Sequence, residues 1–296
     1  MSKKVIDVSS YQGKIDWKKV KASGVEGAVL KVIRKDLNPD KQFENNWAGC
    51  EDADMPIVGV YNYSYATTVS KAKKDAEKVI DTLKGRRAKV WFDTEDAVQK
   101  GLGSKLPEII NAYQKEIVDA GLDFGVYTGL SFYNSYIKPW HHTIDSNFWM
   151  ARYPSSARVG VDYMPDPKKQ PVINHTVEGW QFSSKGLVPG ISGNVDMNVW
   201  YGDIVQSNKP LKNVYPVPER LLYLKTINMR GDDVRWLQHH LIRLGFLPKY
   251  NKKNKSNIDG VFGKDTHNAV IAAQKHYGVE VDGIVGTVTR YVLQFN

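Results

Sequence analysis

The sequence lacks features that define several classes of protein. Its 296 residues include one cysteine, Cys50, which excludes an internal disulfide framework and a zinc site built from cysteines. Its longest apolar runs have the length of a β-strand, so no membrane-spanning helix is predicted. The start, MSKKVIDVSSY, reaches a strand-like run after four residues and shows no signal-peptide core. We therefore expect a protein that is made in a cytoplasm, or one that leaves it by a route other than a cleaved leader.

Two common cofactor sites are also missing. None of the seven histidines has the H-E-x-x-H spacing of a zinc site, and we interpret all seven, including His239 and His240, as surface or loop residues. The Gly-rich turn with which open α/β sheets hold dinucleotides follows none of the strand-like runs. We therefore predict neither a metal nor an organic cofactor.

The net charge of +9 is unevenly distributed along the chain. Residues 1–206 contain 27 basic and 25 acidic residues, whereas residues 207–296 contain 14 and 7. This asymmetry indicates a catalytic body with a basic anchoring module, which would be attracted to nucleic acid, an anionic membrane or an anionic wall polymer. Surface lysines that only aid solubility are the alternative explanation.

The two regions meet at residues 207–219, SNKPLKNVYPVPE, which contain three prolines and no helical pattern. Before this linker, strand-like runs alternate with amphipathic helical segments, and the helices become sparse after the fifth run. About eight strands favour closure of the sheet. We predict an α/β fold in which residues 1–206 form an irregular (β/α) barrel that lacks some outer helices. A flat doubly wound sheet is the alternative.

Four acidic residues fall on or near the ends of the predicted strands, where the functional residues of a β/α barrel lie. Asp93 and Glu95 end the fourth strand-like run, Asp7 lies on the first, and Asp196 lies on the last. Closure would bring the first and last strands together and gather all four carboxyl groups. Such a cluster can cleave a glycosidic bond, since like charges keep one carboxyl protonated, or it can hold a divalent metal.

Aromatic residues occupy the same strand ends and favour a polysaccharide cleft, because their rings stack on sugars. They are Tyr61, Tyr63, Tyr65, Tyr127, Trp149, Tyr153 and Trp180. The alternation of the first three onto one face is equally compatible with a packed barrel interior.

Six short motifs are spread over residues 3–203: DVSSYQG at 7–13, VWFDTED at 90–96, GVYTG at 125–129, WMARY at 149–153, WQFS at 180–183 and VDMNVW at 195–200. In sequence and in order they resemble glycoside hydrolase family 25, the muramidases of phage endolysins and bacterial autolysins. The resemblance implies an irregular β/α barrel that hydrolyses the β-1,4 bond between N-acetylmuramic acid and N-acetylglucosamine in peptidoglycan.

The resemblance also assigns roles to residues. It makes Glu95 the general acid and Asp93, Asp7 and Asp196 the other acids of the site. It lines the sugar groove with Tyr61, Tyr63, Tyr127, Trp149, Tyr153, Trp180 and Gln181. Retention can run through a covalent aspartate adduct or through the substrate's own N-acetyl oxygen, and we favour the second route, with Asp93 orienting the acetamido group.

The basic tail contains an internal repeat, IDGVFGKDT at 258–266 and VDGIVGTVT at 281–289. An amphipathic run, DDVRWLQHHLIRLG, precedes it, and we predict a three-helix module over residues 220–296. It resembles the peptidoglycan-binding type 1 domain, which implies attachment to the bacterial cell wall. An EF-hand calcium-binding loop around Asp259 is the alternative interpretation, but the alternating acidic residues and the final glutamate of that motif are missing.

Taken together, these patterns predict a two-domain wall hydrolase. Its partner would be peptidoglycan, with anionic wall polymers as a further candidate; we expect no nucleic-acid partner and no membrane insertion. It would wait in the cytoplasm of the host bacterium until released, and then act at the wall. The alternative function is a non-hydrolytic protein that binds cell-wall carbohydrate.

Overall fold

A computed structural model describes residues 2–202, 204, 215–248, 251 and 256–295. The chain divides into two compact units, one drawn from residues 1–208 and the other chiefly from 209–296. Of the predicted linker at 207–219, residues 207–214 lie outside the described residues. No helix in the described part of the chain combines the length and apolar character needed to cross a membrane.

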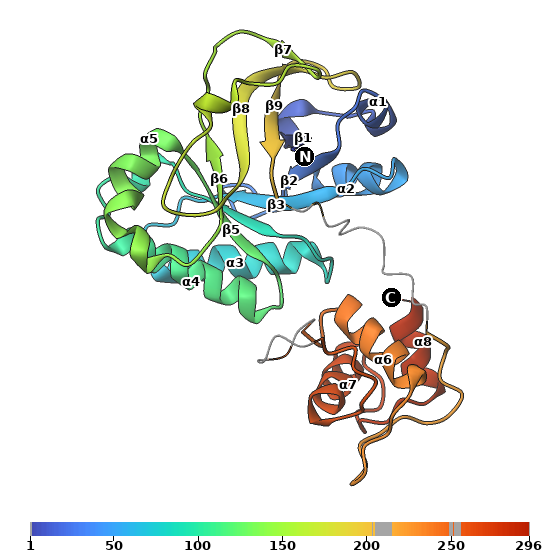
Figure 1. The fold of residues 1–296 in the computed structure, drawn as a ribbon. Helices are drawn as coiled ribbons and strands as arrows, with labels where there is room; N and C mark the ends of the chain where they lie inside the picture. The colour runs from blue at the N-terminus through green and yellow to red at the C-terminus, as the bar shows by residue number, and fades with distance from the viewer. Residues whose placement is uncertain (1, 203, 205–214, 249–250, 252–255, 296) are drawn as a thin grey trace. The chain divides into compact units, whose positions relative to one another are not determined.

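A closed barrel forms the first unit, as the alternating pattern predicts (Figure 1). Its strands run parallel from β1 to β6, β8 is parallel to β6, and β9 lies antiparallel between β8 and β1. The short strand β7 pairs with β8 alone and stays outside the ring. The strands are β1 (Lys3–Val8), β2 (Gly27–Lys31), β3 (Ile57–Tyr63), β4 (Val90–Asp93), β5 (Phe124–Gly129), β6 (Phe148–Ala151), β7 (Val159–Gly160), β8 (Val177–Leu187) and β9 (Val195–Trp200).

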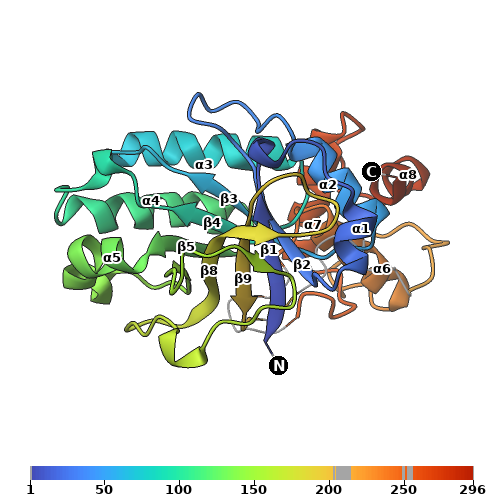
Figure 2. The ribbon, with the colours of Figure 1, turned by 90° about the horizontal axis from the view of Figure 1, so that it is seen from above.

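The helices of this unit cover the first half of the barrel better than the second. The long ones, α3 and α4, pack side by side (Figure 2). After β5 the connections contain only the one-turn α5 and short π and 3-10 turns, so the predicted loss of outer helices is confirmed. The helices are α1 (Trp17–Ala22), α2 (Phe43–Asp52), α3 (Val69–Leu83), α4 (Lys105–Asp119) and α5 (Leu130–Phe132).

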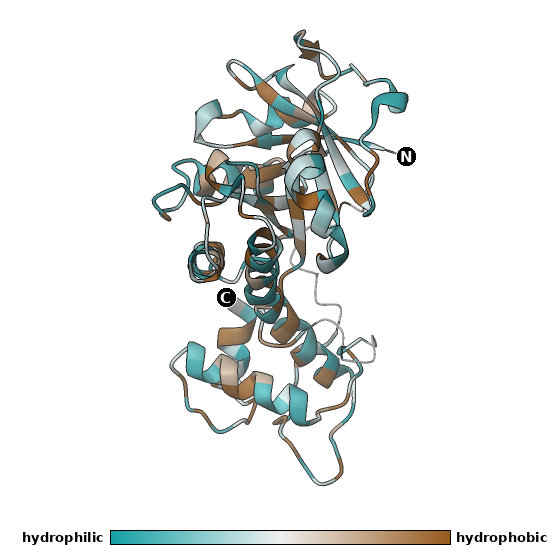
Figure 3. Ribbon diagram, turned by 90° about the vertical axis from the view of Figure 1, so that its left-hand side faces the viewer, coloured by the Kyte–Doolittle hydropathy of each residue, from teal (hydrophilic) through white to brown (hydrophobic). Residues whose placement is uncertain are grey.

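Burial of one helical face explains why these segments are helical. Ala72, Ala76, Val79 and Leu83 of α3 recur at helical spacing and are all buried, as the sequence predicts. Figure 3 shows the same two-sided character, because hydrophobic and hydrophilic segments alternate along the helical ribbons. The main core therefore lies between the outer side of the barrel and its helices.

Tryptophan rings fill the inside of the barrel. Trp91, Trp149 and Trp200 are at most 1% exposed, and their ring centroids lie 5.5–6.0 Å apart. Two inward-facing glycines make room for them, since a Cβ on Gly125 or Gly179 would come within 2.4 Å of a ring atom. This tryptophan plug forms the floor of the barrel end at which the parallel strands finish, which we call the mouth.

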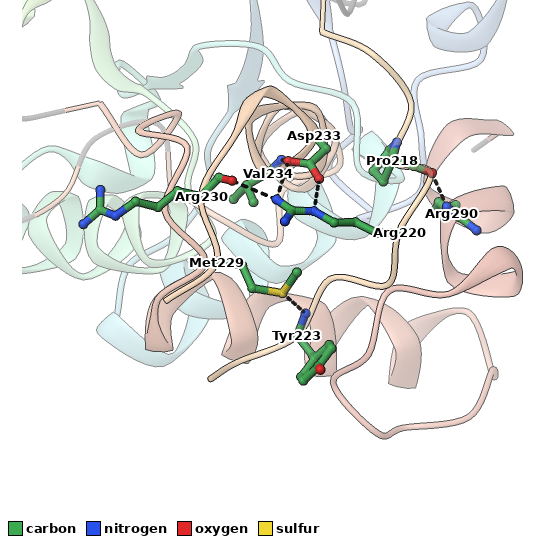
Figure 4. Close-up of polar contacts among 8 residues, drawn as sticks. All are labelled: Pro218, Arg220, Tyr223, Met229, Arg230, Asp233, Val234 and Arg290. Carbon is green, nitrogen blue, oxygen red and sulfur yellow. Dashed lines mark hydrogen bonds and ion pairs between the residues drawn. The ribbon is translucent and has the colours of Figure 1, made fainter. Parts of the chain in front are cut away.

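The second unit contains the three predicted helices, α6 (Asp232–Arg243), α7 (Lys264–His276) and α8 (Thr287–Phe295). The segment before α6 is fixed to it by Arg220, whose guanidinium bonds the Asp233 carboxylate at 2.6 Å and the Arg230 carbonyl oxygen at 2.8 Å (Figure 4). On α8, Arg290 donates to the carbonyl oxygen of Pro218.

One prediction for this unit is wrong. His239 and His240 are 4% and 6% exposed rather than on the surface. The cause is that α6 contacts both α7 and α8, so most of its circumference is enclosed.

Candidate active site

The closure of the barrel places Asp7 and Asp196 directly opposite each other on β1 and β9. Because β9 runs antiparallel, its second residue reaches the same rim as the fifth residue of β1. Opposed residues on antiparallel strands have Cβ atoms about 5 Å apart, so the two carboxyl groups are neighbours. The predicted meeting of these acids at the mouth is confirmed.

Asp93 and Glu95 reach this neighbourhood from β4, although only Asp93 ends the strand, as predicted for both. Asp93 ends β4 and pairs with Tyr127 of β5, whereas Glu95 lies two residues beyond the strand in the following loop. The expectation that Glu95 lies on the strand is therefore wrong. Its charge nevertheless raises the pKa of Asp93, and Asp7 raises the pKa of Glu95, so the acids act on one another.

Burial is the main cause of an unusual protonation pattern at the mouth. It raises the pKa of all four carboxyl groups. Like charge adds to the effect, because Asp7 and Glu95 both raise the pKa of Asp196. The backbone N–H of Gly129 opposes it at Glu95 by bonding the ionised form. The site thus holds protonated carboxyl groups at a pH where exposed ones would be ionised.

Hydrogen bonds distinguish Asp7 from the other acids. Its Oδ2 accepts from the side-chain amides of Asn198 at 2.8 Å and Gln181 at 3.0 Å. Asn198 is fixed in turn by Trp149, whose indole N–H donates to its Oδ1 at 2.8 Å. Donors to a carboxylate favour its charged form, and both amides lower the pKa of Asp7 against the larger effect of burial.

Asn198 is a site residue that sequence reasoning missed. Its signal was available, because Asn198 lies two positions after Asp196 on the same strand and therefore shares the inward face. An amide at an inward position of an otherwise apolar strand needs buried partners.

Gln181 has all its polar contacts inside the protein. It is 3% exposed, and its Oε1 accepts from the hydroxyls of Tyr127 at 2.8 Å and Tyr153 at 2.6 Å. Its amide nitrogen donates to Asp7. This arrangement makes Gln181 a support for Asp7, whereas the sequence assigned it to the sugar groove.

The predicted groove aromatics separate into surface and floor. Tyr61 and Tyr63 are half-buried at the mouth, and Tyr153 is 49% exposed. Tyr127 and Trp149 are buried, with ring centroids 4.4 Å apart, and belong to the floor. Both residues lie beside the acids, as predicted, but their rings are buried and cannot stack on a sugar.

Trp180 does not reach the mouth at all. It is 1% exposed, packs in the core outside the barrel, and donates its indole N–H to the carbonyl oxygen of Arg152 at 2.8 Å. Its neighbour Gln181 points inward, and successive residues of a strand face opposite sides. The prediction that Trp180 lines the groove is therefore wrong.

Lys31 is a second residue that the sequence did not single out. Its ammonium nitrogen lies 5.8 and 5.7 Å from the ring centroids of Tyr61 and Tyr63. Its positive charge lowers the pKa of Asp93 and partly offsets burial there. A lysine at the end of a strand resembles a surface residue, so the sequence gave no reason to select it.

Comparison with known proteins shows which families the chain resembles. Residues 6–191 match the glycosyl hydrolases family 25, and residues 230–293 match a family of peptidoglycan binding domains. The chain is 28% identical over 301 residues to the autolytic lysozyme of Clostridium acetobutylicum, covering 98% of this chain and 78% of that protein.

Solved structures show the same barrel. The catalytic domain of endolysin ply40 from bacteriophage P40 of Listeria monocytogenes has a TM-score of 0.55 at 23% identity, covering 71% of this chain and 98% of that chain. The modular autolysin LytC of Streptococcus pneumoniae, solved with a synthetic peptidoglycan ligand, has a TM-score of 0.54 at 27% identity, covering 68% and 47%. The chain belongs to glycosyl hydrolases family 25 and is a glycoside hydrolase of the lysozyme, or N-acetylmuramidase, type.

Proposed function

We propose that the enzyme cleaves the β-1,4 bond from N-acetylmuramic acid to N-acetylglucosamine in peptidoglycan, with Glu95 as the general acid. The observation that carries this proposal is the cluster of four carboxyl groups at the mouth, in which Asp7 and Asp93 are buried, whereas Glu95 is half-buried and has a raised pKa. A general acid must hold a proton and also reach the substrate. Burial and the charges of Asp7 and Asp96 favour the protonated form of Glu95, and its side chain is partly exposed at the mouth.

The pair formed by Asp7 and Asp196 divides its charge unequally. Two amide donors favour the ionised form of Asp7, whereas partial burial and the charges of Asp7 and Glu95 raise the pKa of Asp196. We assign the negative charge to Asp7 and the proton to Asp196. A fixed negative charge at the mouth then stabilises the positive charge that develops on the sugar ring in the transition state.

The reaction proceeds in two steps. The Glu95 carboxyl gives its proton to the glycosidic oxygen as the C1–O bond breaks, and the substrate's acetamido oxygen bonds to C1 with retention overall. Water then adds to C1, its proton passes to the Glu95 carboxylate, and the bond from the acetamido oxygen breaks. Asp93 Oδ1 is buried without a hydrogen-bond partner among the described residues, and it would accept from the acetamido N–H.

Reducing-end analysis tests the proposed bond. Purified peptidoglycan is digested, reduced with borohydride and hydrolysed to its sugar alcohols. Cleavage after N-acetylmuramic acid yields muramitol, whereas cleavage after N-acetylglucosamine yields glucosaminitol. A glucosaminitol product, or no new reducing end, would overturn the proposal.

Replacement of Glu95 by Gln tests the proposed acid. We expect Glu95→Gln to lower kcat by a factor of about 10²–10⁴, because the amide cannot donate a proton to the leaving oxygen. Circular dichroism and sedimentation with purified walls should not change. Glu108→Gln makes the same chemical change at an exposed position of α4 and is the matched control. Glu95→Gln activity near that of the unmodified enzyme would assign the acid elsewhere.

We also propose that the second unit anchors the enzyme to the wall. Residues 230–293 match the family of peptidoglycan binding domains, and residues 207–296 carry 14 basic against 7 acidic residues. This positive charge supports anionic wall polymers as an additional binding partner. Sedimentation with walls before and after removal of those polymers separates the two contributions.

A further inference from the structure

A cavity opens at the rim of the barrel, and Tyr153 of its lining is linked to Asp7 through Gln181. It has a volume of about 220 Å³ and lies between the segment after β6 and the second half of β8. The side chains that line it and bear polar groups are Tyr153, Ser155, Ser156, Ser183, Ser184 and Lys185.

The lining offers hydrogen-bond donors and positive charge. The Oγ atoms of Ser155 and Ser183 accept from the backbone N–H groups of Ala157 and Lys185, each at 3.1 Å, so their own hydroxyl hydrogens remain to donate. Lys185 contributes an exposed ammonium group, and no described residue of the lining is acidic. This lining favours a carboxylate group as ligand, because it presents hydroxyl donors and one positive charge.

The cavity is coupled to the catalytic acids through Tyr153. One side of Tyr153 lines the cavity, and its hydroxyl donates to Gln181, which donates to Asp7. The register of β8 with β9 shifts on both sides of Ser183, which is 3% exposed. Irregular pairing of this kind occurs beside active sites, where it redirects side chains. The cavity is thus held at a defined place next to the mouth.

We propose that this cavity binds a carboxylate of the short peptide that branches from the muramoyl residue of the substrate. The inference rests on the proposed function, because that substrate carries such a peptide beside the bond to be cleaved. A sugar is a poorer occupant, since Tyr153 supplies the single aromatic ring of the described lining. A metal cation is poorer still, because the described lining contains no carboxylate and includes the Lys185 ammonium group.

The consequence is a preference for glycan chains that still bear their peptides. Binding energy from a contact made equally in the ground and transition states lowers KM and leaves kcat unchanged. Contacts in the cavity should therefore lower KM for peptide-bearing chains. They should change neither KM nor kcat for chains from which an amidase has removed the peptides.

Kinetics of Lys185→Ala on the two substrates test this proposal with the full chain. On peptide-bearing chains we expect KM to rise about fivefold with kcat unchanged, because a charged hydrogen bond at an exposed site is lost. On peptide-free chains both constants should match those of the unmodified enzyme. Lys138→Ala, which removes another exposed lysine outside the cavity, is the matched control and should change neither.

A binding measurement separates failure of this proposal from failure of the proposed function. N-acetylmuramoyl-L-alanyl-D-glutamate is titrated against the unmodified enzyme and Lys185→Ala, together with the same compound whose glutamyl carboxylates are amidated. Weaker binding of the acid, but not of the amide, to Lys185→Ala supports the cavity even if no muramoyl bond is cleaved. Equal loss on both glycan substrates, or no difference between acid and amide, would overturn the cavity assignment and leave the glycosidase intact.

Discussion

Aspartates serve opposite purposes in the barrel mouth and in the C-terminal module. In the mouth, burial and like charge raise the pKa of Asp196, and no hydrogen bond from a described residue offsets them. In the module, Asp282 accepts from the backbone N–H of Ile284 and the side chain of Gln274, each at 2.8 Å, and its pKa is lowered. The partners of the carboxyl group decide whether it stores a proton or fixes a turn.

The C-terminal module fixes two turns with the same set of contacts. Gln238 of α6 donates to Asp259 at 2.8 Å and accepts from the Gly260 N–H at 2.9 Å. Gln274 of α7 donates to Asp282 and accepts from the Gly283 N–H at 2.8 Å. The repeated D-G-x-x-G-x-x-T sequence is therefore a structural device that joins each turn to the preceding helix.

The largest effect should follow from breaking one of these glutamine contacts. Gln274 is fully buried, and Gln274→Glu would replace its donating nitrogen with an oxygen that faces the Asp282 carboxylate. We expect the module to lose about 3 kcal/mol of stability, since a buried donor is lost and a buried charge is left unpaired. Hydrogen exchange on the full chain should show faster exchange in α7 and α8.

The same variant tests the separation of the two units. Sedimentation with walls should fall, while hydrolysis of soluble wall fragments stays at the unmodified level. Gln294→Glu, on the exposed side of α8, makes the same chemical change and should alter neither property. Wild-type exchange rates in Gln274→Glu would show that the contact is dispensable.

A smaller effect should follow from changing a donor at the mouth. Asn198→Asp keeps an acceptor for the Trp149 indole but places a carboxylate oxygen against Asp7. The pKa of Asp7 should rise further, so the acidic limb of the pH profile of kcat/KM should move up by about one unit, equivalent to about 1.4 kcal/mol.

Gln181→Glu removes the other amide donor to Asp7 and should shift that limb in the same direction. A merely structural role for Asn198 would instead lower kcat/KM equally at every pH. An unmoved acidic limb in both variants would refute the assignment of the negative charge to Asp7.

The barrel and the gathering of acids could be predicted because they follow from alternation and closure. Closure pairs the first and last strands, and in the register that they adopt Asp7 lies opposite Asp196. The antiparallel direction of β9 could also have been predicted. Seven residues, 188–194, separate it from β8, whereas a parallel crossover needs a dozen or more.

The orientation of individual side chains could not be predicted in the same way. A shift of one residue decides whether Trp180 or Gln181 faces inward, and both are buried residues of β8. The positions of Lys31 and His239 could not be predicted for the same reason. The packing of neighbouring elements places Lys31 at the mouth and buries His239 in the core of the second unit. The anchoring role of the module stays a prediction.

The central claim is that the carboxyl groups at the mouth retain their protons, and that this retention lowers the stability of the folded protein at high pH. The variant Asp196→Asn tests this claim most directly. A carboxyl whose pKa is raised by folding stabilises the native state at low pH, and this contribution is lost as pH rises through its folded pKa. Asn cannot ionise, so chemical unfolding of the full chain should show Asp196→Asn about 1 kcal/mol more stable than the unmodified enzyme at pH 8. The two should be equal in stability at pH 4. A variant that is less stable than the unmodified enzyme at pH 8 would contradict the account.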